Sequence, residues 1–150
     1  MPQDLRTANS ISEALHDWLR ACPQLKSGAK VGADYLPDRE TEYAIIAMPS
    51  SIQSRENVLG EEIPDPVQTQ NFTFASKEPY GADIAQNLAN QAFYEGVAAW
   101  IWEQNAQRKF PKIPGGTVKS IVPTLTAYIA DTSADVARYQ ISLKLTYRIA

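Results

Sequence analysis

The fold is decided by the C-terminal stretch ARYQISLKLTYRIA, residues 137–150. Its odd-numbered positions from 137 to 149 carry Ala, Tyr, Ile, Leu, Leu, Tyr and Ile, whereas its even-numbered positions from 138 to 148 carry Arg, Gln, Ser, Lys, Thr and Arg. This alternation is typical of a half-buried β-strand, because successive side chains of a strand point to opposite faces of the sheet. The pattern predicts a long strand with one face in the core and one basic face outside it.

The segment before this strand predicts a partner for it. Residues 117–130 have strand character, and the polar residues 131–135 connect them to the strand at 136–149, which predicts a C-terminal β-hairpin. Pro123 has no amide hydrogen to give to a sheet, so we expect a bulge or an edge position for the strand that contains it.

Two amphipathic helices are expected to cover the apolar face of the sheet. Ser10 and Glu13 have the spacing of a capping box at a helix start, although the helix could begin a turn or two earlier, near Asp4, and Pro23 limits its end. A second, longer helix is expected from the cap Asp83 to about residue 107, with room for a small kink near residue 90. Of the three tryptophans, positions 18 and 100 fall on apolar stripes, whereas position 102 points elsewhere and is a candidate interface anchor.

The remaining segments complete an α+β domain. Strands are expected at residues 31–36, 42–48 and 68–76, and the second of these is apolar on both sides, as in the interior of a sheet. Residues 49–66 contain three prolines and one glycine, and we interpret them as a long extended loop or loose hairpin. We therefore predict a single domain over residues 1–150, with a mostly antiparallel sheet and both helices on one of its faces.

Composition limits the possible functions. The 150 residues suit one domain, and a net charge of −3 argues against a general nucleic-acid-binding protein. The single cysteine, Cys22, excludes an internal disulfide framework and a cysteine-based zinc site. The first residues lack the apolar run of a secretion signal, and no apolar stretch is long enough to span a bilayer, so we expect no membrane association and a reducing cytoplasm as the place of synthesis.

No constellation of residues indicates chemistry. His16, the only histidine, lies beside acidic residues and is expected to be a solvated helix residue, and Cys22 is expected to close the helix end against the core. The two are poorly placed for a thiol–imidazole pair, and the chain has no phosphate loop, dinucleotide fingerprint or nucleophile elbow. We expect no catalytic residue, cofactor or metal. A small hydrolytic enzyme working through His16 or a carboxylate pair remains an alternative, as does a nucleic-acid-binding module that uses the basic strand.

Two sets of charged residues are candidates for partner contacts. The first lies in the excursion at 49–66, which is longer than the roughly 12–15 residues that loops within a compact domain seldom exceed, and consists of Arg55, Glu56, Glu61, Glu62 and Asp65. The second lies on the even-numbered face of the last strand and consists of Arg138, Lys144 and Arg148. A solvated outer sheet face explains the second set equally well. If the two sets meet on neighbouring copies, the contact joins different surfaces and can close a ring.

Long segments of the chain resemble one family. VGADYLPDRETEYAI (31–45), FTFASKEPYGADIAQNLANQAFYEGVAAWIWEQN (72–105), KIPGG (112–116) and TAYIADTSADVARYQISLKLTY (126–147) are similar to minor capsid or tail-terminator proteins of long-tailed bacteriophages and prophages. The similarity runs from about residue 11 to residue 147 and is weakest at 50–66. It carries no catalytic signature and transfers no residue.

The resemblance implies a non-enzymatic virion subunit of the tail or neck, assembled in the host cytoplasm. Such a subunit forms a homo-oligomeric ring, typically a hexamer, that caps the tail tube and contacts both the tail tube protein and the head-side connector protein. DNA is expected to pass through the lumen without specific binding, along a wall lined by acidic residues. A head-closure or connector protein of the same particle is the alternative.

Overall fold

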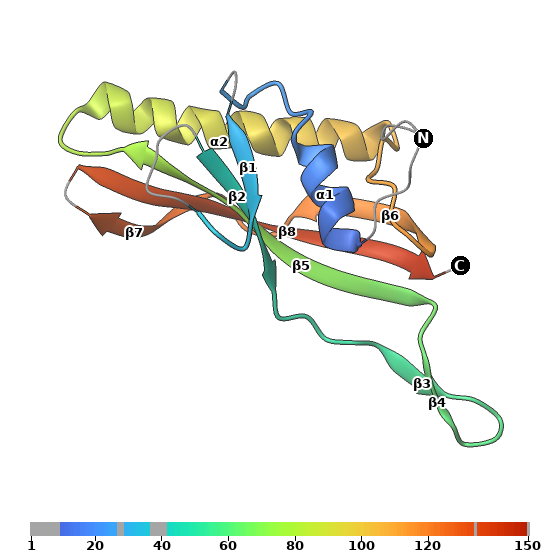
Figure 1. Ribbon diagram of the computed structural model, residues 1–150. Coiled ribbons are helices and arrows are strands. Elements are labelled where there is room, and N and C mark those ends of the chain that lie inside the picture. Colours follow the sequence, from blue (N-terminus) through green and yellow to red (C-terminus); the bar gives the residue numbers. More distant parts are fainter. Residues whose placement is uncertain (1–9, 27–28, 37–41, 134, 150) are drawn as a thin grey trace.

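The computed structural model describes residues 10–26, 29–36, 42–133 and 135–149. The expectation of a helix start near Asp4 lies outside these residues. A six-stranded sheet has the order β1 (Lys30–Ala33), β2 (Glu42–Met48), β5 (Val67–Pro79), β8 (Val136–Ile149) and then β6 (Gly116–Pro123), and β7 (Tyr128–Ser133) also pairs with β8. Only the β1–β2 pairing in this sheet is parallel. The helices α1 (Ile11–Leu19) and α2 (Ile84–Ala106) lie on one face of it (Figure 1), which confirms the predicted α+β fold.

The apolar side chains that alternate along β8 form part of the hydrophobic core. The odd-numbered side chains from Ala137 to Leu145 are at most 3% exposed, whereas Ile149 at the strand end is 38% exposed. On the neighbouring strand β5, Phe72 lies opposite Leu143 and Phe74 lies opposite Ile141, so the apolar row continues across the sheet. The strand at the centre of the core is therefore the one that the sequence pattern identified.

Aromatic side chains tie α2 to the sheet. The ring of Tyr94 stacks on that of Tyr139 with centroids 5.9 Å apart, and the Phe74 ring is 6.2 Å from that of Tyr94. The Tyr94 hydroxyl donates to the Tyr139 carbonyl oxygen at 3.0 Å and lies 2.6 Å from the hydroxyl of Ser76. Burial raises the pKa of Tyr94 far above its ordinary value, so this phenol remains a neutral structural group.

The predicted strand at residues 117–130 is wrong in one respect, because it is two strands. β6 ends at Pro123 and β7 begins at Tyr128, and both pair with the same edge of β8. The amide of Thr124 still donates to the Ser142 carbonyl at 2.9 Å, after which the chain leaves the sheet. Pro123 lies on an edge strand, as predicted, and the predicted loop at 131–135 is shorter because residues 131–133 pair with β8.

Two other strands have bounds that differ from the prediction. β1 ends at Ala33 instead of residue 36, because Asp34 has φ 58° and turns the chain while its carboxylate accepts from the Ala47 amide at 3.0 Å. β5 extends beyond residues 68–76 on both sides. Ser10 and Asp83 cap the two helices as predicted, and α2 is continuous through Asn90.

Candidate assembly surfaces

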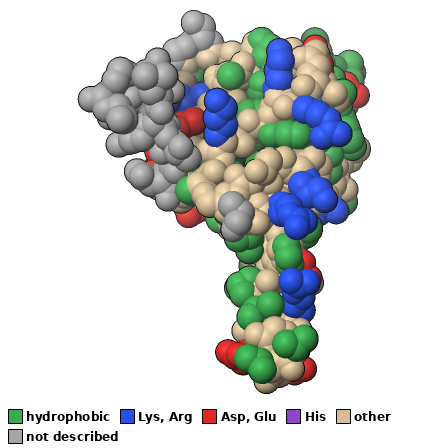
Figure 2. Space-filling model, turned by 90° about the vertical axis from the view of Figure 1, so that its right-hand side faces the viewer, with side chains coloured by type: hydrophobic (Ala, Val, Ile, Leu, Met, Phe, Trp, Pro, Cys, Tyr) green, Lys and Arg blue, Asp and Glu red, His purple; other side chains and the backbone are tan. Residues whose placement is uncertain are grey.

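An arm extends from the body of the protein. Residues 49–66 contain a separate two-stranded hairpin of β3 (Ser54–Glu56) and β4 (Glu62–Pro64), and Figure 1 and Figure 2 show it projecting well away from the sheet. This is the loop or hairpin that the sequence predicts at this position. We call residues 49–66 the arm.

The tip of the arm is an ordered turn. The Asn57 amide donates to the Glu61 carbonyl at 2.9 Å, and the Asn57 side-chain oxygen accepts from the amides of Leu59 and Glu61 at 2.9 and 3.0 Å. Gly60 has φ 80°, a conformation that favours glycine. The turn presents Val58 and Leu59, which are 102% and 78% exposed, so the tip carries an apolar pair that nothing in the described protein covers.

Acidic side chains flank this apolar tip. Glu56 lies directly opposite Glu62 in the hairpin register, and Glu61 lies in the turn that connects their strands. The hydroxyl of Ser54 donates to Glu62 Oε2 at 2.9 Å, but none of the three glutamates forms an ion pair with a described residue. Of the other predicted contact residues in the arm, Arg55 is exposed, whereas Asp65 lies at the base and its carboxylate accepts from the Val67 amide at 2.9 Å.

The three predicted cations of β8 are not equivalent. Lys144 and Arg148 are exposed on the sheet face opposite the helices, near the strand end. Arg138 lies ten residues before Arg148, about 33 Å away along the strand. It is half-buried, its Nε has no hydrogen-bond partner among the described residues, and it pairs in register with Asp131 of β7. Lys144 and Arg148 thus share an exposed face, about 13 Å apart along the strand, whereas Arg138 is separate from them.

Further exposed cations lie in the segment that leads into the strand beside Arg148, and the sequence interpretation missed them. The register places Thr117 opposite Arg148 and Gly116 opposite Ile149, so the loop before β6 lies beside the end of β8. Five exposed cations gather at this end of the molecule, and we call them the basic end: Arg108, Lys109, Lys112, Lys119 and Arg148. A signal was present, because residues 104–123 contain four of these cations and no Asp or Glu.

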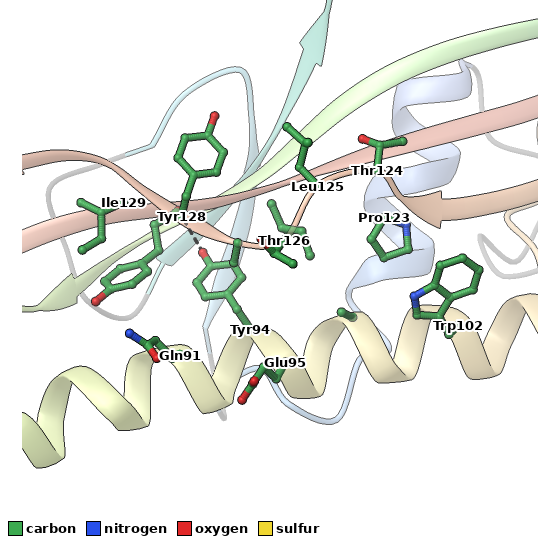
Figure 3. Close-up of a pocket in the computed structure, with 14 residues that line it drawn as sticks. Gln91, Tyr94, Glu95, Trp102, Pro123, Thr124, Leu125, Thr126, Tyr128 and Ile129 are labelled. Atoms are coloured by element: carbon green, nitrogen blue, oxygen red, sulfur yellow. Dashed lines mark hydrogen bonds between the residues drawn. The ribbon is translucent and has the colours of Figure 1, made fainter.

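An apolar groove lies between α2 and the segment that interrupts the edge strand. It has a volume of about 570 Å³, its floor includes Tyr94 and Ile141, and residues 123–129 form its far wall. Figure 3 shows Tyr94 and Trp102 rising from α2 toward that wall. Trp102 is 52% exposed, as predicted for an interface candidate, and the far wall adds the exposed side chains of Leu125, Tyr128 and Ile129.

The residues considered for chemistry have structural contacts. His16 is not a solvated helix residue, since its side chain is 25% exposed, with Nε2 on the Val31 carbonyl and Nδ1 3.1 Å from Asp17 Oδ1. The histidine thereby links α1 to β1. Cys22 is buried against the core, as predicted, and burial raises the pKa of its thiol, which disfavours the reactive thiolate.

The described residues contain neither a metal-binding cluster nor a membrane-spanning helix. No group of three or more His, Cys, Asp or Glu side chains in this part of the chain is arranged to hold a metal ion. None of the helices described here has the length and hydropathy needed to span a membrane.

Known proteins show little similarity to this chain. No family model matches the chain. One curated protein, the catalytic subunit of dihydroorotate dehydrogenase B (NAD(+)) from Alkaliphilus metalliredigens (strain QYMF), is 28% identical over 72 residues, which are 48% of this chain and 24% of that protein. The chain thus spans about a quarter of that subunit's length, and a similarity of this extent does not establish a common family or activity.

Proposed function

We propose that the protein is a non-enzymatic structural subunit of a long-tailed bacteriophage or prophage particle, a tail terminator that caps the tail tube as a ring. The observation that carries this proposal is the arm, a preordered hairpin that projects from the body and ends in the exposed apolar pair Val58 and Leu59. An isolated subunit gains nothing from an apolar tip in water, whereas a subunit that inserts the tip into a neighbour gains its burial.

The distribution of exposed apolar side chains supports an assembly function. Apart from Tyr35, the large exposed apolar side chains lie in two regions of the described protein. One is the arm with the sheet end at its base, and the other is α2 with the groove beside it. A ring of identical subunits needs two different surfaces that complement one another, and two separate regions satisfy this requirement.

The organisation of the body also supports the proposal. Of the side chains considered for chemistry, His16 bonds the Val31 carbonyl and Cys22 is buried against the core, and the buried Tyr94 hydroxyl bonds the Tyr139 carbonyl. The hydroxyl–carboxylate pair of the arm, Ser54 and Glu62, is exposed on the hairpin surface and lies outside the groove. The resemblance to tail-terminator and minor capsid proteins names the particle in which such a subunit would work.

Tail tube assembly in vitro tests this function. Adding this protein to polymerising tube protein should shorten the tubes and leave a ring at one end in electron micrographs. If the protein instead binds filled heads and leaves tube length unchanged, it is a head-side connector. If it binds neither, the proposal is wrong.

A further inference from the structure

We propose that the basic end of one copy binds the acidic arm tip of a second copy, so that arm and body form a heterologous contact between subunits. This inference rests on the proposed function only in assuming that identical subunits assemble. It assigns a specific receptor surface, Lys112, Lys119 and Arg148, to the glutamates of the arm.

The opposed acids of the arm have no cation on their own face of the hairpin. Glu56 and Glu62 face each other across the hairpin, and like charges in directly opposed positions destabilise a strand pair. The guanidinium of Arg55 belongs to the alternate residue of β3, whose partner in the register is Ile63, so it extends from the other face of the hairpin. A cation supplied from outside would relieve this repulsion, and no described residue of the same subunit supplies it.

The basic end lacks acidic residues that could balance its charge. The segments that build it, residues 104–123 and 138–149, contain no Asp or Glu, although the whole protein has more acidic than basic residues. Figure 2 shows Lys and Arg side chains spread over this end of the body and down to the base of the arm. Such a cluster repels itself unless a negatively charged partner covers it.

The two surfaces of one subunit do not meet. Figure 1 and Figure 2 agree that the arm carries its tip away from the body, whereas the basic end belongs to the body where α2 ends and β6 begins. Only a second subunit can bring an arm tip to these cations. Because the contact joins different surfaces, repetition of it produces a ring or a helical filament.

Phosphate groups of DNA could also bind five cations, but they would explain only half of the observations. A DNA contact leaves the glutamates of the arm and the exposed Val58 and Leu59 without a partner. An arm tip that binds the basic end satisfies both charge clusters at once, and its apolar pair adds burial to the contact.

A charge exchange tests the contact. The arm variant Glu56→Lys/Glu61→Lys/Glu62→Lys and the end variant Lys112→Glu/Lys119→Glu/Arg148→Glu are each measured by sedimentation at low and high salt. We expect the unmodified protein to self-associate in a salt-sensitive manner, and each variant alone to associate at least tenfold more weakly. An equimolar mixture of the two variants should regain association, because each arm then meets an end of opposite charge.

Controls make the result specific. Glu103→Lys/Asp135→Lys changes exposed acids outside the arm and should leave association unchanged, and circular dichroism verifies that every variant is folded. Absence of self-association in the unmodified protein, or failure of the mixture to recover it, would overturn the inference. Binding of a DNA duplex that is lost in the end variant but kept in the arm variant, without recovery on mixing, would identify the basic end as a nucleic-acid surface instead.

The same variants separate this inference from the proposed function. Tube capping that persists in both variants would leave the terminator function standing and remove the arm-to-end contact. Recovery of association on mixing, together with no effect on tubes, would keep the contact and remove the terminator function.

Discussion

The side-chain amide of Gln68 forms two hydrogen bonds with the backbone of Gln53. It accepts from the Gln53 amide at 3.0 Å and donates to the Gln53 carbonyl at 2.7 Å, as a neighbouring strand would. Gln68 is only 5% exposed and belongs to β5, whereas Gln53 immediately precedes β3. A buried residue of the sheet therefore orients the arm, which explains how a hairpin with few other contacts keeps a defined direction.

Removing this link should loosen the arm without unfolding the body. In Gln68→Ala, the Gln53 amide loses its hydrogen-bond partner, which costs about 1–3 kcal/mol, whereas the Gln53 carbonyl keeps its bond from the Asp65 amide. We expect faster amide hydrogen exchange in residues 50–66 and unchanged exchange in β8, measured by mass spectrometry. Exchange that accelerates equally in both regions would show that the arm is not held separately. Gln70→Ala, on the same strand and partly exposed, is the matched control.

Gly60 is required by the backbone of the arm tip. A Cβ at this position would meet no atom within 4 Å, so Gly60→Ala introduces no clash and adds only the strain of φ 80°, about 1 kcal/mol or more. We expect faster proteolysis at the tip and weaker assembly with an unchanged melting temperature. Gly81→Ala, which also meets no atom within 4 Å and has no positive φ, should change none of these properties. Equal behaviour of the two variants would contradict an ordered tip.

Leu143 and Lys144 provide a direct test of the two faces of β8. Leu143 is 0% exposed in the core, whereas the adjacent Lys144 is exposed on the other face. Leu143→Ala should lower the free energy of unfolding by about 2–5 kcal/mol, and Lys144→Ala should stay within about 0.5 kcal/mol of the unmodified protein. Leu143→Asp should prevent folding altogether. Urea denaturation measures both alanine variants, and similar values for them would refute the assigned orientation of the strand.

The carboxylate of Glu78 needs Lys26. Glu78 is 5% exposed, and its Oε1 lies 3.0 Å from Lys26 Nζ, but the lysine side chain is 42% exposed and partly screened by water. Lys26→Met should therefore destabilise the protein by about 2 kcal/mol, less than for a fully buried pair. The double variant Lys26→Met/Glu78→Gln should recover part of this loss in thermal denaturation. A double variant less stable than the single one would show that Glu78 depends on other partners.

Trp102 is expected to act in assembly and not in folding. Its side chain is half exposed at the rim of the groove, so Trp102→Ala should lower the free energy of unfolding by no more than about 1 kcal/mol. Truncation of an aromatic anchor at an interface typically costs about 2 kcal/mol or more of binding energy. We therefore expect roughly tenfold or greater loss of association by sedimentation. Tyr35→Ala, an exposed aromatic side chain outside the groove and the arm, should have no effect on association.

The parts of the fold that the sequence predicts are those with an unambiguous local pattern. The period of two in β8 and the cap residues Ser10 and Asp83 each specify an element without reference to the rest of the chain. The interruption between β6 and β7 was missed because residues 124–127 keep strand-like composition, and only their pairing with β8 shows where the chain leaves the sheet.

The candidate surfaces were predictable only in part, for a similar reason. The acids of the arm are close in sequence, so the excursion could be identified from its composition. The basic end depends on the register that places Thr117 opposite Arg148, and the contact of His16 with Val31 joins elements fifteen residues apart. Neither follows from a local pattern, and the half-buried position of Arg138 likewise depends on its neighbours in β5 and β7.

The most direct test of an arm-mediated terminator compares the intact protein with a variant whose arm tip, residues 57–60, is replaced by a two-residue turn. Both are added to growing tail tubes, and the tube ends are imaged by cryo-electron microscopy. A terminator that caps through its arm should give a multi-subunit ring at one end of short tubes with the intact protein, and long uncapped tubes with the variant. Capping by both proteins, or by neither, would contradict this expectation.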